Sequence, residues 1–152
     1  MTRPFCILAL ALAAFATAAP GQAAPAPRKV CTQAGLTGVW SLKSVVAAEP
    51  GVQDFYRQHP VEYMRFTTAG KYDYVARDTP LAGLATVSAS LNRADAADGV
   101  TYAARIQGNG MLIIYRDGQP FQGFMCAMEG PVMVWSELSG NPHLNRRQVR
   151  VR

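Results

Sequence analysis

The stretch GLTGVWSLKSV, residues 35–45, has the pattern of a β-strand. Leu36, Gly38, Trp40 and Leu42 occupy alternate positions, and the residues between them are mostly polar. Such alternation is typical of a strand with one apolar face. Glycine weakens the interior of a strand, so its place two residues before the tryptophan needs a structural reason. We interpret this stretch as the first strand of the fold.

More alternating segments follow, and turn-forming residues separate them. The run 62–77 predicts a hairpin that turns at Ala69-Gly70, and a short helical turn is expected before it, near residues 54–58. Strands are also expected at 100–106 and 111–116, and the last strand near 145–151. The turns that delimit the remaining segments are Gly108-Asn109-Gly110, Asp117-Gly118, Gly130-Pro131 and Asn141-Pro142. The sequence therefore predicts a mostly β domain with seven or eight antiparallel strands.

One segment has a helical period instead. Leu81, Leu84, Val87 and Leu91 are spaced by three and four residues, which places them on one side of a helix. Thr79 followed by Pro80 is a typical helix start. We predict one helix over residues 80–93, with its leucines packed against the sheet or across the end of a barrel.

The first residues have the layout of a secretory signal peptide. A basic Arg3 precedes an apolar run over residues 5–19, and small residues follow it. A retained membrane anchor is the alternative, but the run is shorter than the roughly 20 residues that a spanning helix needs. We predict a signal peptide at 1–18, with cleavage as late as residue 23, a lead-in at 19–34 and one domain at 35–152. The protein is then periplasmic or secreted, without stable membrane insertion.

The cysteines are consistent with export. Cys6 would leave with the leader, so Cys31 and Cys126 would remain as an even pair in an oxidising compartment. A disulfide that closes so long a loop stabilises a fold by about 4 to 5 kcal/mol in the chain-entropy model. The alternative is a soft-metal site, because Met128 shares the strand face of Cys126. We predict the disulfide, and neither a metal nor a cofactor.

The chain is mildly basic, with a formal net charge of +5. Arg146, Arg147, Arg150 and Arg152 concentrate part of this charge in the last strand. A patch for nucleic acid or anionic lipid is one interpretation. No aromatic residues for base stacking are interleaved with these arginines. We therefore predict an edge strand that its charges protect from pairing, and no nucleic-acid partner.

Gly38-Val39-Trp40 in a first strand resembles the start of the lipocalins and the wider calycin superfamily, and the runs YMRFTTAGKYDYV (63–75) and NRRQVRV (145–151) are similar to short bacterial lipocalin-like domains. The resemblance implies an antiparallel barrel in which Trp40 closes one end. It also implies that Gly38 lets another part of the chain pass closely, and that an arginine of the last strand packs on the indole. Arg147 has the parity of Val149 and Val151, so we expect it to be that arginine.

The sequence offers little for catalysis, and we assign no catalytic residue. His59 and His143 lie beside prolines in turn-like segments, which is typical of surface loops. Gly108-Asn109-Gly110 leads into a strand and not into a helix, unlike a nucleotide-binding loop. An enzyme is not excluded, but no motif argues for one.

Aromatic residues favour binding instead. Those that could line a pocket are Phe66, Tyr72, Tyr74, Tyr102 and Tyr115, with Phe121 and Trp135 adding apolar bulk. The alternative is that they fill the interior of a small barrel. We expect a non-enzymatic binding protein for a small apolar or amphipathic ligand; a module that binds a protein through the barrel rim is the alternative. A cavity of about 300 Å³ or more would favour the binding of a small ligand. A filled interior with an exposed apolar patch would favour the binding of a protein partner.

Overall fold

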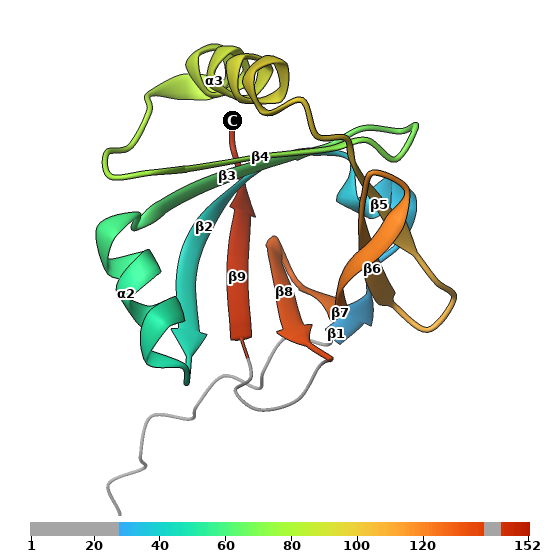
Figure 1. Cartoon of the computed structure of the whole chain (residues 1–152). Helices are drawn as coiled ribbons and strands as arrows, with labels where there is room; N and C mark the ends of the chain where they lie inside the picture. Colours follow the sequence, from blue (N-terminus) through green and yellow to red (C-terminus); the bar gives the residue numbers. More distant parts are fainter. Residues whose placement is uncertain (1–27, 139–143) are drawn as a thin grey trace, which may run out of the picture.

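The computed structural model describes residues 28–138 and 144–152 (Figure 1). In this part of the chain nine strands form one antiparallel sheet, and three helices accompany them. The strands are β1 Arg28–Val30, β2 Gly38–Ala47, β3 Val61–Phe66, β4 Tyr72–Arg77, β5 Tyr102–Ile106, β6 Met111–Arg116, β7 Gln119–Glu129, β8 Val132–Glu137 and β9 Leu144–Arg150. The helices are α1 Gln33–Leu36, α2 Pro50–Gln58 and α3 Gly83–Asp98.

Eight of these strands form a nearly closed antiparallel barrel, as the sequence predicts. Their order around the barrel is β4-β3-β2-β9-β8-β7-β6-β5. The seam between β4 and β5 is held by one bridge, between Lys71 and Ala103, and by a 2.8 Å hydrogen bond from the Ala104 amide to the Gly70 carbonyl. The barrel therefore closes at a single point of this seam.

The turns agree with the predicted turn chemistry. Asp117 and Gly118 form a two-residue loop between β6 and β7, and both have positive φ, of 48° and 78°. This backbone is that of the hairpin turns that favour Asp-Gly. Gly130-Pro131 likewise joins β7 to β8. The predicted turn at Asn141-Pro142 lies outside the described residues.

The last strand is not an edge, so this prediction was wrong. β9 pairs with β2 on one side and with β8 on the other. Three of its arginines have partners: Arg146 with Glu62, Arg147 with Glu129, and Arg150 with backbone carbonyls. These charges hold β9 to neighbouring parts of the barrel.

α3 covers the outer face of β3 and β4, as Figure 1 shows. Of its own residues, Val87 and Leu91 are fully buried, but Leu84 is 43% exposed, contrary to the predicted leucine face. The helix also begins three residues later than predicted. The Tyr63 hydroxyl accepts a 2.9 Å hydrogen bond from the Leu81 amide and donates one of 3.3 Å to the Leu81 carbonyl. This long-range contact holds the chain before the helix.

β1 lies in the segment predicted as a lead-in, yet it belongs to the sheet. It pairs with the end of β7, and the disulfide between Cys31 and Cys126 joins the two segments. The predicted disulfide is therefore confirmed, and Cys126 does not offer a free thiolate to a metal. The predicted signal peptide lies outside the described residues. Within 28–138 and 144–152, no helix is both long and apolar enough to span a bilayer.

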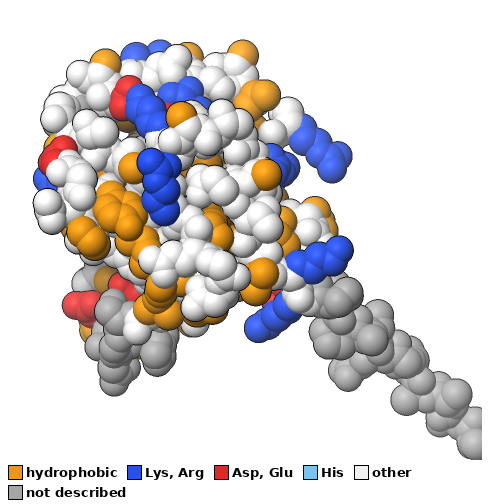
Figure 2. All heavy atoms as spheres, turned by 90° about the vertical axis from the view of Figure 1, so that its right-hand side faces the viewer, with side chains coloured by type: hydrophobic (Ala, Val, Ile, Leu, Met, Phe, Trp, Pro, Cys, Tyr) orange, Lys and Arg blue, Asp and Glu red, His pale blue; other side chains and the backbone are white. Residues whose placement is uncertain are grey.

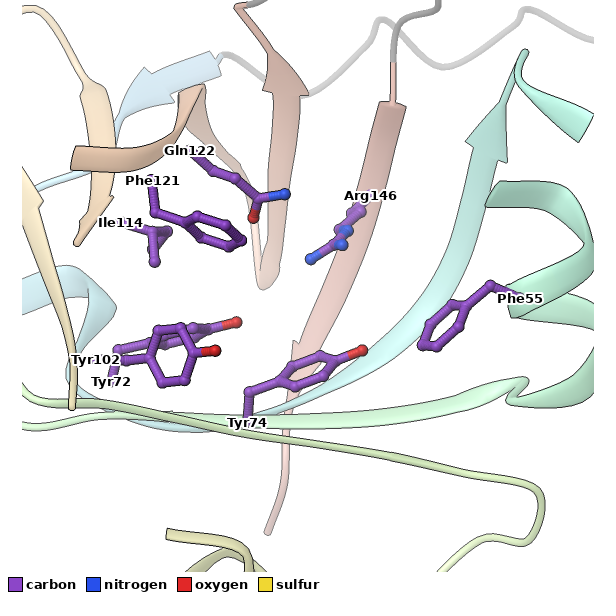
Figure 3. A pocket seen from close by; sticks show the side chains of 8 residues that line it. All are labelled: Phe55, Tyr72, Tyr74, Tyr102, Ile114, Phe121, Gln122 and Arg146. Atoms are coloured by element: carbon purple, nitrogen blue, oxygen red, sulfur yellow. The ribbon is translucent and has the colours of Figure 1, made fainter. Parts of the chain in front are cut away.

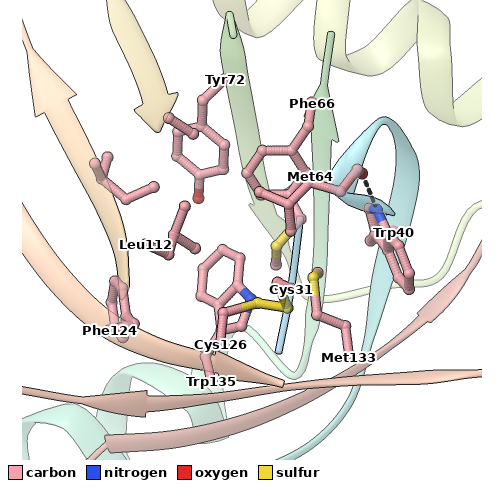
Figure 4. Packing of buried hydrophobic residues seen from close by; sticks show 13 residues of the cluster. Cys31, Trp40, Met64, Phe66, Tyr72, Leu112, Phe124, Cys126, Met133 and Trp135 are labelled. Carbon is pink, nitrogen blue, oxygen red and sulfur yellow. Dashed lines mark hydrogen bonds between the residues drawn. A yellow bond between two sulfur atoms is a disulfide. The ribbon is translucent and has the colours of Figure 1, made fainter. Parts of the chain in front are cut away.

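The barrel interior is packed with large side chains (Figure 4). Trp40, Met64, Phe124, Met133 and Trp135 are fully buried there. A second apolar cluster lies outside the barrel beneath α3, where Tyr63, Val87 and Leu91 are buried and Val39, Val61, Val75, Leu81 and Val151 pack around them. The sheet therefore has apolar residues on both faces where α3 covers it.

Candidate functional site

A cavity of about 240 Å³ opens into the barrel. Its walls come from six elements that are distant in sequence, and Figure 3 shows their side chains converging on one space. The lining residues are Phe55 of α2, Tyr72 and Tyr74 of β4, Tyr102 of β5, Ile114 of β6, Phe121 and Gln122 of β7, and Arg146 of β9. The walls are mainly aromatic, and the polar groups of Arg146, Gln122 and the tyrosines face the space between them.

Arg146 is the charged group of this cavity. It is 9% exposed, and its guanidinium lies 3.4 Å from the carboxylate of Glu62, which is fully buried. The same guanidinium lies 5.6 to 6.0 Å from the ring centroids of Tyr56, Phe124 and Trp135. Buried charges require partners. The cation is therefore held by one carboxylate and by aromatic faces.

Burial raises the pKa of Tyr56, Tyr72 and Tyr74, and the nearby Glu62 carboxylate raises it further. The three phenols thus stay protonated well into the alkaline range. Burial alone would lower the pKa of Arg146, but the Glu62 carboxylate and the phenols of Tyr56, Tyr72 and Tyr74 together outweigh this effect, and the pKa of the guanidinium is raised. The cavity region disfavours negative charge on its phenols and keeps Arg146 cationic.

Several buried polar atoms near Arg146 have no hydrogen-bond partner within the described residues. They are the Arg146 Nε, the Trp135 Nε1 and both amide atoms of Gln148. Gln148 lies two positions after Arg146 and is fully buried. Most buried polar groups in folded proteins are paired. The barrel interior therefore has hydrogen-bonding capacity that its own side chains leave unused.

Three of the five aromatic residues predicted to line a pocket do so: Tyr72, Tyr74 and Tyr102. Phe66 lies deeper, 1% exposed, with its ring stacked on Tyr72 at 5.1 Å. Tyr115 follows the lining residue Ile114, so strand alternation directs it to the outer face. Phe121 and Trp135 were expected to add apolar bulk to the pocket. Phe121 lines the cavity, and Trp135 lies in the core.

Sequence reasoning missed Arg146, Gln122, Ile114 and Phe55 as lining residues. Arg146 was interpreted as one of the charges that protect an edge strand, and it lies on the parity opposite to Val149 and Val151. Those valines face outward, and Val151 packs beneath α3. Ile114 lies two positions after Leu112, a core residue, and therefore on the same face of the strand. This alternation in MLIIYR is a signal that could have identified it.

The Trp40 end of the barrel is built as the resemblance implies, but with another arginine. Trp40 is fully buried, and its Nε1 donates a 2.7 Å hydrogen bond to the Leu36 carbonyl. The guanidinium over its ring is that of Arg150, 4.4 Å from the centroid. Arg147 faces outward and pairs with Glu129 at 2.6 Å, so its assignment to Trp40 was wrong. The parity argument failed because the inward face of β9 is the polar one.

Two features of the structure require glycine at position 38. Its φ is +134°, which other residues rarely adopt, and a Cβ there would overlap the Arg150 guanidinium. Arg150 also donates to the carbonyls of Thr37 and Gly35 at 2.6 and 2.7 Å. The glycine therefore leaves room for the arginine that covers the tryptophan.

Of the two histidines, His59 packs against Phe55 with ring centroids 5.1 Å apart, and His143 lies outside the described residues. Among the residues that the structure describes, no group of three or more His, Cys, Asp or Glu side chains could hold a metal ion.

Comparison of the chain with protein-family models, with curated proteins and with solved structures found no match.

Proposed function

We propose that this chain is an exported, non-enzymatic binding protein that holds a small apolar or amphipathic ligand in the barrel cavity. The observation that carries the proposal is the convergence of aromatic walls and a few polar groups on one space. Ligand sites in proteins have this composition. Its volume of about 240 Å³ is smaller than the roughly 300 Å³ expected above for a ligand cavity, so the proposal is restricted to a molecule smaller than a drug-sized ligand.

The barrel and the disulfide support the remaining parts of the proposal. The nearly closed antiparallel barrel, with Gly38 and Trp40 at one end, is compatible with a lipocalin-like fold. A disulfide is typical of proteins outside the cytoplasm. N-terminal sequencing of the protein recovered outside the cytoplasm tests export. A new terminus between residues 19 and 24 supports it, and an intact Met1 contradicts it.

The binding test uses 2-naphthol, a small neutral amphiphile, followed by saturation-transfer NMR. We expect saturable binding to the wild-type protein. Gln122→Trp places an indole at the cavity wall and should weaken binding at least tenfold. Gln119→Trp is the control, because Gln119 is an exposed residue of the same strand that does not line the cavity. Circular dichroism checks that both variants fold. Absence of binding, or equal binding by both variants, contradicts the proposal.

A protein partner is the second candidate, and one observation favours it. Ile113, Pro120, Phe121, Gln122, Gly123 and Glu137 line a shallow depression of about 420 Å³ on the outside of the barrel. Phe121 is 51% exposed and Leu138 44% exposed. Figure 2 shows hydrophobic side chains gathering low on the face that carries β5 and β6. A photo-crosslinker at Leu138 should give a discrete adduct in the producing cell, and one at the equally exposed Leu84 should not.

A further inference from the structure

The chemistry of the cavity narrows the class of ligand, on the basis of the binding function proposed above. Arg146 can only donate hydrogen bonds. Within the described residues its guanidinium makes one hydrogen bond, the 3.4 Å contact with Glu62. Tyr74 donates to the same carboxylate at 3.3 Å. Glu62 is fully buried and does not line the cavity. The groups that a ligand meets therefore include a strong donor and no carboxylate.

The buried atoms behind the wall have the same bias. The Arg146 Nε, the Trp135 Nε1 and the Gln148 Nε2 are donors without acceptors in the described part of the chain. Leaving a buried donor unsatisfied is unfavourable. The Gln148 Oε1 is an unpaired acceptor in the same region, so three unpaired donors stand against one unpaired acceptor. A ligand that supplies an acceptor therefore suits this site better than one that supplies only donors.

The charge of the site argues for a neutral ligand. The guanidinium of Arg146 and the carboxylate of Glu62 form one buried pair whose formal charges cancel. A carboxylate ligand would add a second buried anion that no other cation of the cavity wall compensates, and such burial is costly. Burial and Glu62 already raise the pKa of Tyr72 and Tyr74, so the site disfavours negative charge at its phenols. An added anion would meet the same penalty.

The volume of the cavity indicates the size of the ligand, and the aromatic walls indicate its shape. An apolar cavity of about 150 Å³ holds benzene, so about 240 Å³ corresponds to roughly ten non-hydrogen atoms. Phe55, Tyr72, Tyr102 and Phe121 present aromatic rings to this space. Aromatic pairs attract one another beyond their buried area. A flat aromatic body therefore fits better than a flexible chain.

From these four properties we infer that the ligand is an uncharged aromatic carbonyl compound of about ten non-hydrogen atoms, with its carbonyl oxygen accepting from the Arg146 guanidinium.

Four probes of similar size and different head groups test the inference at pH 7: acetophenone, benzoate, 1-phenylethylamine and ethylbenzene. We expect acetophenone to bind the wild-type protein at least tenfold more tightly than each of the others. Benzoate binding more tightly than acetophenone would show that the site selects an anion. Ethylbenzene binding as tightly as acetophenone would show that the acceptor has no role. Either outcome overturns the inference while the binding function stands.

Failure of all four probes is also informative. If 2-naphthol still binds, the inference is overturned and the proposed function is retained. If 2-naphthol fails as well, both are overturned. The two claims are therefore separated by the same set of titrations.

A matched pair of variants tests the role of Arg146. Because removing Arg146 would leave Glu62 buried without a cation, we choose Arg146→Lys, which keeps the charge and loses the planar fork of donors. We expect a loss of about tenfold in acetophenone affinity, and ethylbenzene affinity within about twofold of wild type. Arg147→Lys, one residue away on the outer face, should change neither the acetophenone affinity nor the ethylbenzene affinity. Equal effects of both variants on acetophenone affinity contradict the inference. If Arg146→Lys does not fold, the selectivity of the wild-type protein among the four probes tests the inference.

Discussion

Gly38, Trp40 and Arg150 depend on one another. The guanidinium of Arg150 lies over the Trp40 ring and donates to two carbonyls of the segment that precedes β2. It occupies the space that a side chain at Gly38 would need. A cation over an indole has the attraction expected of a charge on an aromatic face. These contacts tie the last strand to the first residues of β2 at one end of the barrel.

Arg150→Ala should therefore lower the free energy of unfolding by about 1 to 2 kcal/mol. Arg147→Ala removes a partly exposed ion pair with Glu129 and should cost only about 0.5 kcal/mol. Urea denaturation of the two variants and the wild type, side by side, measures both losses. A larger loss for Arg147→Ala than for Arg150→Ala would contradict the assignment of Arg150 to Trp40.

At the scale of elements, the strands of the barrel could be predicted closely because their signals are local, whereas β1 lies in the segment predicted as a lead-in. Alternation and turn residues such as Asp117-Gly118 depend on the chain within a few residues. The start of α3 could not be predicted in this way. Tyr63 holds Leu81 through hydrogen bonds across 18 positions of sequence, and this contact delays the helix. A capping signal at Thr79 and Pro80 is weaker than such a long-range contact.

The lining of the cavity was predicted only in part, for a physical reason. Alternation separates two faces of a strand but does not say which one points inward. In β9 Arg147 and Val149 lie on the outward face, and Val151, just after the strand, packs partly buried against the cluster beneath α3. The inward face carries Arg146 and Gln148. A buried arginine that is paired with Glu62, 84 positions away, leaves no local pattern.

The packing of α3 predicts the effects of two leucine variants. Leu91 is fully buried between the helix and the sheet, so Leu91→Ala should lower the free energy of unfolding by roughly 2 to 4 kcal/mol. Leu84 is 43% exposed, and Leu84→Ala should stay within about 0.5 kcal/mol of wild type. Chemical denaturation of both variants provides the comparison. Equal losses would mean that α3 presents another face to β3 and β4.

At the scale of the whole molecule, the two ends of the barrel differ. α1, Trp40 and Arg150 close one end, where Leu36 and Trp40 are fully buried. Arg146 lies farther along β9, paired in register with Val45 near the end of β2 and with Trp135 of β8. α2 follows β2 and directs Phe55 toward the cavity (Figure 3). The end of the barrel at Trp40 and Arg150 thus stabilises the fold. The cavity lies beside Arg146, where buried polar groups have no hydrogen-bond partner among the described residues.

The buried phenols make stability depend on alkaline pH. The pKa values of Tyr56, Tyr72 and Tyr74 are raised in the folded state, chiefly by burial. Below the ordinary phenol pKa of about 10, both states keep these protons and the contribution does not change. Above it the unfolded chain releases protons that the folded state retains, so the free energy of unfolding falls as pH rises.

Urea denaturation at pH 9 and pH 11 checks this dependence. Tyr74→Phe removes one of the raised groups, so its stability should fall less between the two values than that of the wild type. Tyr115→Phe is the control, because the hydroxyl of Tyr115 makes no hydrogen bond among the described contacts and its residue faces outward. Equal falls in both variants would contradict the burial of the Tyr74 phenol.

The binding of a small molecule inside the barrel is tested most directly by methyl NMR on isoleucine-labelled protein titrated with 2-naphthol. Ile114 lines the cavity, whereas its neighbour Ile113 lines the outer depression. We predict a saturable shift of the Ile114 methyl signal and nuclear Overhauser effects between that methyl and the ring protons of the ligand, with Ile113 unaffected. Shifts at Ile113 alone, or no shift at either residue, would contradict a binding site in this cavity.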